Sequence, residues 1–229
     1  MSAGAPSDAS IVESWRHNVE AWTAAVRERR IESRELVTDG AILDAVLSRS
    51  PRSVLDIGCG EGWLARALGT RAIQVLGIDA IAGLIACARA AGGGEFRVAT
   101  YQQAAAGALN FRADVAVCNF SLLGRESVDM VFAAMPALLG PGGAFIIQTL
   151  HPLVACGDEP YRDGWRAGSW AGFSADFTDP APWYFRTLAS WLALFRTHGL
   201  RLLELREPLH PRTRQPASVI FIADAAGPL

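Results

Sequence analysis

Two aspartates separated by a glycine-rich turn are the residues of this sequence best suited to binding chemistry. Asp56 lies at the end of the apolar run 54–57 and precedes Gly58, Gly60 and Gly62, and Asp79 ends the next apolar run. Glycine lets the backbone approach a ligand closely, and the N-terminus of a following helix attracts negative charge. An acidic residue about twenty positions after such a turn can accept hydrogen bonds from both hydroxyls of a ribose. The spacing therefore predicts a nucleoside-binding site.

The elements that must position these residues follow from the hydrophobic periodicity. Apolar residues recur at steps of three and four from residue 11 to about residue 47, which predicts an amphipathic helix and then a second helix that ends at Ser50-Pro51. Beyond Pro51, short apolar runs alternate with helical stretches, as in βαβ units around a parallel sheet. We expect strands at 54–57, 73–78, 96–99, 115–120 and 144–149, and helices at 63–68, 83–90 and 127–139.

The segment 151–182 interrupts this alternation. It is rich in Gly, Pro, Asp and aromatic residues and has no clear period, so we interpret it as a functional lid. A helix over 183–198 and strands over 200–206 and 217–223 are expected to follow, the two strands pairing antiparallel at the sheet edge. One domain therefore spans residues 11–229, made of a helical cap (11–50), a ligand-binding core (51–150), the lid insertion (151–182) and a C-terminal helix and strand pair (183–229). Residues 1–10 are predicted to be a disordered tail.

Composition excludes several classes of protein. The chain is 51% hydrophobic and 19% charged, which suits a packed core, and its net charge of −2 offers no basic surface for nucleic acid. No apolar run is long enough to span a membrane, and the N-terminus lacks the features of a signal peptide. The four cysteines are far apart and show no metal-ligand spacing, so we predict free thiols, no metal site and a cytoplasmic location.

The glycine-rich turn carries a resemblance to a known family. The run 54–62, VLDIGCGEG, followed by LGID at 76–79, is similar to the nucleoside-methionine binding signature of class I S-adenosylmethionine-dependent methyltransferases of the small-molecule type. The resemblance implies an α/β, Rossmann-like fold whose seven-stranded sheet is mostly parallel with an antiparallel last strand, an N-terminal helical cap and a lid after strand five. It implies S-adenosyl-L-methionine as cofactor and methyl transfer to a small-molecule acceptor held under an aromatic lid.

The resemblance also implies roles for individual residues. Asp79 would hold the ribose hydroxyls, and Asp56 would meet the methionine amino group. Many relatives place an Asp after strand three to bind adenine, but this sequence has Thr100, Tyr101 and Gln102, so Thr100, Gln102 or backbone groups would take that part. Trp15 would cover the cofactor or else be a core residue. Apart from the resemblance, the chemistry of arginine makes Arg34 a candidate bidentate partner for the cofactor carboxylate, with a surface position as its alternative. The predicted cofactor site is Asp56, Gly58, Cys59, Gly60, Gly62, Asp79, Ala80, Ile81, Thr100, Tyr101, Gln102, Asn119, Phe120, Ser121, Trp15 and Arg34.

Residues after strand five are candidates for the acceptor site. His151 follows that strand at the carboxyl edge of the sheet, where open α/β folds bind ligands, so it is a candidate general base or substrate ligand. Its alternative role is to begin a turn, since a second His-Pro pair occurs at 210–211. The lid aromatics either shield an acceptor or simply pack together. The predicted substrate residues are Tyr161, Trp165, Trp170 and Tyr184.

The alternatives to small-molecule methyl transfer are a dehydrogenase, a nucleic-acid methyltransferase and a cofactor-binding subunit. A dehydrogenase is disfavoured because the glycine spacing is not GxGxxG and the chain contains no lysine. A nucleic-acid methyltransferase is disfavoured because Asn119-Phe120-Ser121-Leu122 lacks the prolines of the amino-group methylases. A cofactor-binding subunit without turnover remains an alternative. We expect a small-molecule acceptor, no nucleic-acid or membrane partner, and a possible homodimer through the aromatic lid or the first helix.

Overall fold

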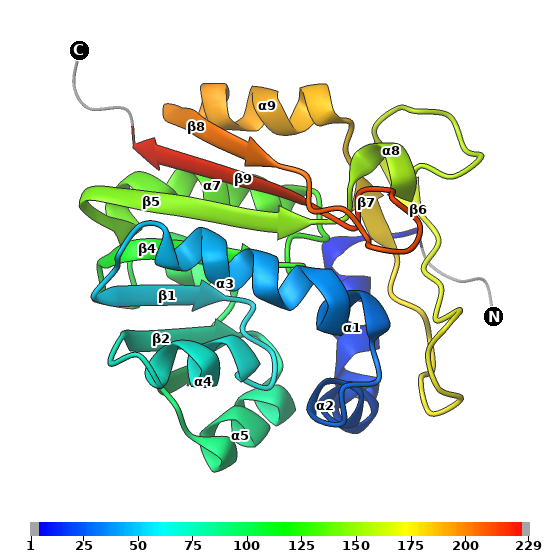
Figure 1. Cartoon of the computed structure of the whole chain (residues 1–229), viewed down its shortest axis with the longest axis horizontal. Coiled ribbons are helices and arrows are strands. Elements are labelled where there is room, and N and C mark those ends of the chain that lie inside the picture. Colours follow the sequence, from blue (N-terminus) through cyan, green and yellow to red (C-terminus); the bar gives the residue numbers. More distant parts are fainter. Residues whose placement is uncertain (1–4, 226–229) are drawn as a thin grey trace.

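A single seven-stranded sheet organises the computed structural model, which describes residues 5–225 (Figure 1). The strand order is β3-β2-β1-β4-β5-β9-β8, and β9 runs antiparallel to the other six strands of this sheet. The α/β class and the mostly parallel sheet with an antiparallel last strand are thus confirmed. The strands are β1 (Ser53–Ile57), β2 (Gln74–Asp79), β3 (Glu95–Val98), β4 (Ala113–Asn119), β5 (Leu139–Thr149), β8 (Leu200–Arg206) and β9 (Val219–Ala225).

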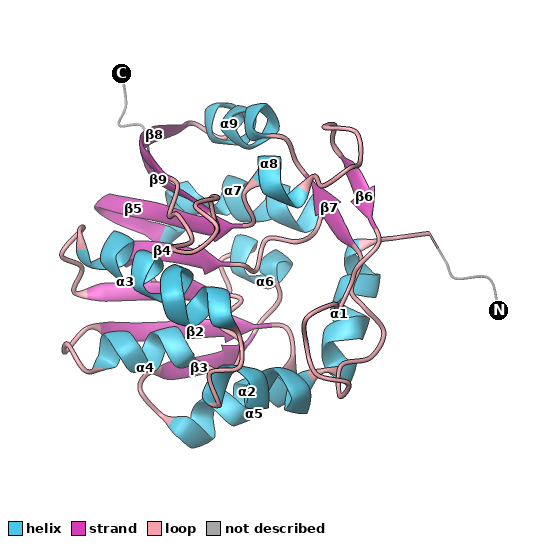
Figure 2. Ribbon diagram, turned by 45° about the vertical axis from the view of Figure 1, so that its right-hand side comes forward, coloured by secondary structure: helices cyan, strands magenta, loops and turns pink. Residues whose placement is uncertain are grey.

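Helices cover both faces of this sheet, as parallel strands require (Figure 1). One face packs under α3 and α4, and the other under α6, α7 and α9. Figure 2 shows α1 and α2 at the edge of the sheet where the parallel strands end. The helices are α1 (Asp8–His17), α2 (Val19–Arg27), the π-helix η1 (Arg34–Thr38), α3 (Asp39–Leu47), α4 (Trp63–Gly69), α5 (Ala82–Ala91), α6 (Tyr101–Ala105), α7 (Glu126–Leu138), α8 (Pro152–Ala155) and α9 (Leu188–Thr197).

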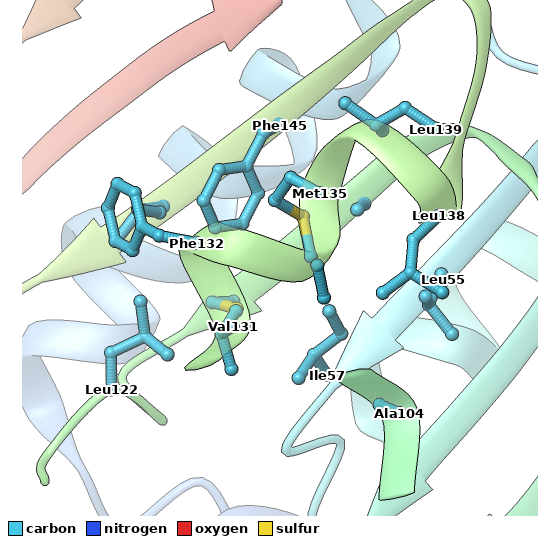
Figure 3. Packing of buried hydrophobic residues seen from close by; sticks show 14 of the residues in the cluster. Leu55, Ile57, Ala104, Leu122, Val131, Phe132, Met135, Leu138, Leu139 and Phe145 are labelled. Carbon is cyan, nitrogen blue, oxygen red and sulfur yellow. The ribbon is translucent and has the colours of Figure 1, made fainter. Parts of the chain in front are cut away.

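Large apolar side chains hold α7 against the sheet. Phe132 and Met135 of α7 are fully buried beside Phe145 of β5 (Figure 3). The rings of Phe132 and Phe145 meet edge to face, with centroids 5.3 Å apart, and Phe195 of α9 lies 4.9 Å from Phe132. This packing makes the sheet and α7 a rigid base for the loops at the carboxyl ends of the strands.

The cap begins earlier and is more broken than predicted. A disordered tail over residues 1–10 is wrong for residues 8–10, because Asp8 begins α1 and Ser7 caps it through the amide of Ser10. Residues 1–4, and residues 226–229 of the predicted domain, lie outside the described part of the chain. The first predicted helix is divided at Asn18, which ends α1 and precedes α2.

The end of the lid also differs from the prediction. Residues 183–185 form the strand β7 (Trp183–Phe185) instead of the start of a helix, and β7 pairs antiparallel with β6 (Gly164–Arg166). A second, two-stranded sheet therefore stands beside the main one (Figure 2). Helix α9 begins only after Thr187, whose side chain caps it.

All four cysteines are free thiols, and three of them are buried. Within residues 5–225, no helix is both long and apolar enough to cross a membrane.

Candidate functional site

The glycine-rich turn after β1 is held by hydrogen bonds to the end of β2. The amides of Gly58 and Cys59 both donate to the carbonyl oxygen of Ile78, at 2.8 and 3.0 Å. Asp79 accepts through one carboxylate oxygen from the amide of Gly60 (3.0 Å) and through the other from the amide of Ile81 (2.8 Å). Asp79 therefore ties the turn that follows β2 to the glycine-rich turn that follows β1.

The three glycines of this turn have different neighbours. All have positive φ, between 56° and 85°. A Cβ at Gly58 would lie 2.3 Å from the Cβ of Ser121, and one at Gly62 would lie 2.9 Å from the ring of Phe96, so these two positions need glycine for packing. A Cβ at Gly60 would lie 3.4 Å from its nearest side-chain neighbour, the indole nitrogen of Trp22 in α2. The cap thus places Trp22, which the predicted cofactor site omitted, over the glycine turn.

Asp56 is buried in β1 and one of its oxygens, Oδ2, has no hydrogen-bond partner among the described residues. Burial, and to a smaller extent the nearby Asp79 carboxylate, raises the pKa of Asp56 from its ordinary 3.8 to about 7. Burial also raises the pKa of Asp79, although the amides of Ile81 and Gly60 oppose this. Two acidic groups of this kind attract a ligand with a positive charge and hydrogen-bond donors.

Further buried polar atoms without partners among the described residues lie on β4, β5 and η1. Side chains two positions apart on a strand share a face. Val54, Val117 and Ile146, which lie two positions before Asp56, Asn119 and Gln148, all pack under α3 and α4. These three side chains therefore point to that face from the ends of the adjacent strands β1, β4 and β5. The atoms without a partner in residues 5–225 include Asp56 Oδ2, Asn119 Oδ1, Gln148 Oε1 and, from the end of η1, Thr38 Oγ1.

Gln148 and Thr38 were not predicted to belong to the site. Gln148 stands out in its strand because it interrupts an apolar run, and its amide nitrogen donates to the hydroxyl of Ser218 at 3.0 Å. Thr38 gives no sequence signal, because only the folding of η1 against the sheet buries its hydroxyl.

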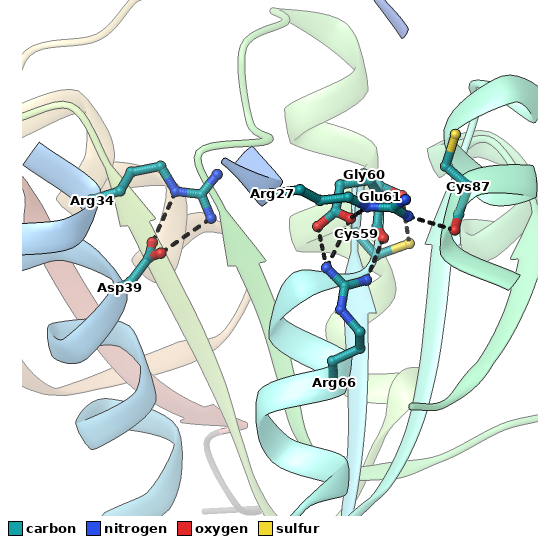
Figure 4. Close-up of polar contacts among 8 residues, drawn as sticks. All are labelled: Arg27, Arg34, Asp39, Cys59, Gly60, Glu61, Arg66 and Cys87. Carbon is teal, nitrogen blue, oxygen red and sulfur yellow. Dashed lines mark hydrogen bonds and ion pairs between the residues drawn. The ribbon is translucent and has the colours of Figure 1, made fainter. Parts of the chain in front are cut away.

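Arg34, the predicted partner of the cofactor carboxylate, is buried near the glycine turn. Its guanidinium lies 4.7 Å from the ring centroid of Trp63, the first residue of α4, and 5.7 Å from that of Trp22. It donates from Nε to Oδ1 of Asp39 at 2.9 Å (Figure 4). A second bond, from Nη2 to Oδ2 of Asp39 at 3.4 Å, completes this pair, so Nη1 is the group that can donate to a ligand carboxylate.

A second arginine network joins the cap to the core. Glu61, inside the glycine turn, is fully buried and accepts from Arg66 of α4 at 2.7 and 2.8 Å. Arg27 of α2 donates to the same carboxylate at 2.9 Å and to the carbonyl of Cys87 (Figure 4). The cap is therefore fixed to the glycine turn by charge as well as by Trp22.

The loops after β3 and β4 bring some of the remaining predicted cofactor residues together and leave others apart. Tyr101 donates to the carbonyl of Ser121 at 2.8 Å, and the hydroxyl of Ser121 donates to the carbonyl of Ile57 at 2.7 Å. Phe120 has φ of +52°, and its amide donates to the backbone carbonyl oxygen of Gln148. Thr100 uses its side chain to cap α6 and Gln102 is exposed on that helix, so neither side chain is held toward the glycine turn.

Cys59, Ala80 and Ile81 contribute to the site mainly through the backbone. The sulfur of Cys59 points toward Gly77 and away from the open side of the turn. Burial, together with the carboxylates of Asp56 and Asp79, raises the pKa of the Cys59 thiol, which disfavours the nucleophilic thiolate. Ala80 is half-buried and Ile81 buried, beside Asp79.

The predicted substrate aromatics separate into different groups. Trp170 packs against Trp15 of α1, with ring centroids 5.7 Å apart, and Trp15 packs against Trp22 at 5.1 Å. Trp165 and Tyr184 pair across the small sheet. Tyr161 is exposed, and its hydroxyl accepts from the amide that begins α9. One group thus extends the cap over the glycine turn, and the others build the outer part of the lid.

His151 is buried just after β5. Its Nε2 lies 2.7 Å from Oε1 of Glu207, while its Nδ1 is buried without a partner within the described residues.

The topology, the glycine turn and the acidic residues that end β1 and β2 define a class I S-adenosylmethionine-dependent methyltransferase. A family model described as a methyltransferase domain matches residues 27–205, and the chain belongs to that family.

Solved structures of similar fold agree with this class. An S-adenosylmethionine-dependent methyltransferase from Mesorhizobium loti is 22% identical and covers 78% of this chain and 95% of its own, with a TM-score of 0.60. The 1,6-didemethyltoxoflavin-N1-methyltransferase of Burkholderia thailandensis is 18% identical and covers 99% of this chain and 94% of its own, with a TM-score of 0.66. The DhpI complex with S-adenosylhomocysteine is 15% identical and covers 96% and 97%, with a TM-score of 0.64. A comparison with curated protein sequences finds no match.

Proposed function

We propose that this chain transfers the methyl group of S-adenosyl-L-methionine to a small-molecule acceptor held between the sheet edge, the cap and the lid. The observation that carries this proposal is the buried Asp56 oxygen without a partner, next to a glycine turn that Asp79 holds in place. A buried acceptor without a donor costs about 1–3 kcal/mol, and a ligand ammonium group would satisfy it.

The donor and acceptor groups present fit this cofactor. Asp56 and Asn119 offer acceptors for an amino group, and Arg34 offers a guanidinium for a carboxylate. Asp79 presents carboxylate oxygens to a ribose beside the open face of Gly60. Trp22 and Trp15 of the cap would cover the bound nucleoside and exclude water.

The bound cofactor would supply an electrophilic methyl group together with its own leaving group, so the protein has mainly to position the acceptor and exclude water. The half-buried aromatic contacts between cap and lid suit this task, because they would cover one side of the site.

Two observations support a small-molecule acceptor over nucleic acid. The chain has a net charge of −2 and offers no excess of positive charge for a phosphate backbone. Among the structural neighbours are the N1-methyltransferase of B. thailandensis crystallised with 1,6-didemethyltoxoflavin, and a glycopeptide N-methyltransferase.

Calorimetry with the purified full chain tests cofactor binding. S-adenosylmethionine and S-adenosylhomocysteine should bind, and NAD should not. Asp79→Asn should weaken both nucleosides by about 100-fold, since hydrogen bonds to a charged group contribute about 1.5–3 kcal/mol each. Asp176→Asn, which alters an exposed carboxylate of the lid, should bind like the parent protein. Binding of NAD instead of the two nucleosides would overturn the proposal.

A methylation screen then tests turnover. Protein is incubated with S-adenosylmethionine labelled in the methyl group and with phenols, hydroxylated aliphatics, aromatic amines, N–H heterocycles, thioethers or RNA. We expect label in one class of small molecule and none in RNA. Tight cofactor binding with no labelled product in any class would favour the alternative of a binding subunit without turnover.

A further inference from the structure

His151 makes one short hydrogen bond through Nε2, and its other ring nitrogen, Nδ1, has no partner within residues 5–225. Nε2 lies 2.7 Å from Oε1 of Glu207, a residue 56 positions away that directly follows β8. Both β5 and β8 end at the same edge of the sheet, so the pair is assembled by the topology. The histidine side chain is almost fully buried, and that of Glu207 is half exposed.

The carboxylate determines where the histidine carries its proton. An ionised carboxylate can only accept hydrogen bonds, so Nε2 must be the donor. In the neutral ring the lone pair then lies on Nδ1. Nδ1 is buried and meets no donor in the described part of the chain, so this arrangement leaves a proton acceptor prepared and unused.

The second His-Pro pair shows what a histidine that only begins a turn looks like. His210 is less buried, and its Nδ1 accepts from the amide of Thr213 three residues on, inside its own turn. His151 also precedes a proline and a helix, yet its side chain makes no capping hydrogen bond to α8. The turn-forming alternative therefore explains His210 but not the unpaired Nδ1 of His151.

This nitrogen lies at the same carboxyl edge of the sheet as the proposed cofactor site. Asp56, Asn119 and His151 mark the carboxyl ends of β1, β4 and β5, which are consecutive in the sheet, and each carries a buried acceptor without a partner. Adjacent strands are about 4.8 Å apart, so β1 and β5 are separated by about 10 Å. That distance accommodates a ligand bound at Asp56 and an acceptor molecule next to it on the β5 side.

We propose that His151 is the general base of the reaction, that Glu207 is the residue that positions it, and that the acceptor therefore carries a removable proton on its attacking oxygen or nitrogen. This inference rests on the proposed methyltransferase function. The X–H bond of the acceptor breaks and its proton moves to Nδ1, while an electron pair of X forms the new bond to the methyl carbon. The electron pair of the broken carbon–sulfur bond stays on sulfur. The imidazolium, stabilised by the Glu207 carboxylate, then returns the proton to solvent when product leaves.

Nitrogen NMR of the four histidines tests the positioning part without any acceptor. In protein labelled with 15N at histidine, His151→Ala identifies the signals of residue 151. We expect the parent protein to carry the ring proton on Nε2, with Nδ1 unprotonated. Glu207→Ala should abolish this preference, and Glu204→Ala, the same change at a neighbouring exposed carboxylate, should preserve it. A proton on Nδ1 in the parent protein, or an unchanged tautomer in Glu207→Ala, would overturn the proposal.

Kinetics with the acceptor that the screen labels test the base itself. His151→Ala should bind S-adenosylmethionine as the parent does but should lose about 100- to 10,000-fold in kcat, the usual contribution of a general base. Added imidazole should restore part of the turnover of His151→Gly. The proposal fails if His151→Ala retains kcat within twofold, or if the labelled acceptor is a thioether, which has no proton to lose. If the parent protein itself does not bind S-adenosylmethionine, the proposed function is refuted instead.

Discussion

The buried carboxyl group of Asp56 indicates a ligand-binding site. Its carboxyl group lies at the end of β1 with Oδ2 unpaired, and its pKa is raised to about 7, so the ligand-free site holds a neutral acid over much of the acidic range. The raised pKa works against the ligand-free fold. Because the folded state keeps a proton that the unfolded state has released, its stability falls as pH rises through the window from 3.8 to about 7. Binding of a cation would reverse that effect.

Cofactor affinity should therefore depend on pH through Asp56. Below pH 7 the carboxyl must lose its proton before it can pair with an ammonium group, so the Kd for S-adenosylmethionine should rise by up to about tenfold per pH unit on acidification, and it should level off above pH 7. Calorimetry between pH 5.5 and 8 measures this slope.

Two variants separate Asp56 from its neighbour. Asp56→Asn should bind more weakly and without the slope. Asp79→Asn should also bind more weakly but should keep much of the slope, since burial is the main cause of the Asp56 shift and Asp79 the lesser one. Equal slopes in the parent protein and Asp56→Asn would contradict this assignment.

At the scale of elements, the cap and the lid form one unit. Asn18, fully buried between α1 and α2, accepts from the amide of Thr178 at 2.9 Å and donates to the carbonyl oxygens of Thr178 and Ser14, both at 2.8 Å. Trp170 adds its indole N–H to the same Thr178 carbonyl and packs on Trp15. Any opening of the lid near Thr178 must therefore break Asn18 away from it.

Asn18→Ala should release the lid from the cap. The substitution removes three hydrogen bonds of a buried amide and should lower the free energy of unfolding by about 1–3 kcal/mol. Hydrogen exchange followed by mass spectrometry should show faster exchange in residues 170–180, with a faster release of S-adenosylhomocysteine in stopped flow. Ser174→Ala, at an exposed lid residue, provides the control. Unchanged exchange across the lid in Asn18→Ala would show that other contacts hold it.

At the scale of the whole molecule, the cap is attached to the sheet domain around one buried carboxylate. Glu61 has no exposed surface, while Arg66 and Arg27 keep 29% and 40% of their side-chain exposure. Arg66 belongs to α4 and Arg27 to α2, so the same carboxylate orders the glycine turn and anchors the cap. The half-exposed Arg27 should contribute less than the Glu61–Arg66 pair, because solvent screens it.

A double-mutant cycle measures this attachment. Glu61→Ala should cost about 3–5 kcal/mol, since it leaves Arg66 without its buried partner, whereas Arg27→Ala should cost about 1 kcal/mol or less. In the Glu61→Ala background, Arg27→Ala should have little further effect on urea unfolding. Additive losses would show that Arg27 acts independently of Glu61. In either background, a saturating amount of S-adenosylhomocysteine should recover stability in proportion to its remaining affinity.

The sequence by itself determined the parts of this protein that depend on neighbours along the chain. Strands β1 to β5 follow from short apolar runs, and the glycine turn with Asp56 and Asp79 follows from residues in consecutive elements. Local geometry requires those residue types, so their pattern is readable. The predicted helix over 183–185 was wrong because an aromatic run has no fixed structure of its own. It becomes β7 only by pairing with β6, whose residues lie about twenty positions earlier.

Only the tertiary structure decided which distant residues meet. Trp22 reaches Gly60, Gln148 lies opposite Asn119, and Glu207 meets His151 because strand order and helix packing place them at one edge of the sheet. None of these contacts leaves a repeating signal, since each joins elements that are separated by tens of residues. The lid aromatics likewise look equivalent in sequence, yet packing assigns Trp170 to the cap and Trp165 to the small sheet. Local propensity thus specifies the elements, and long-range packing specifies the partners within the site.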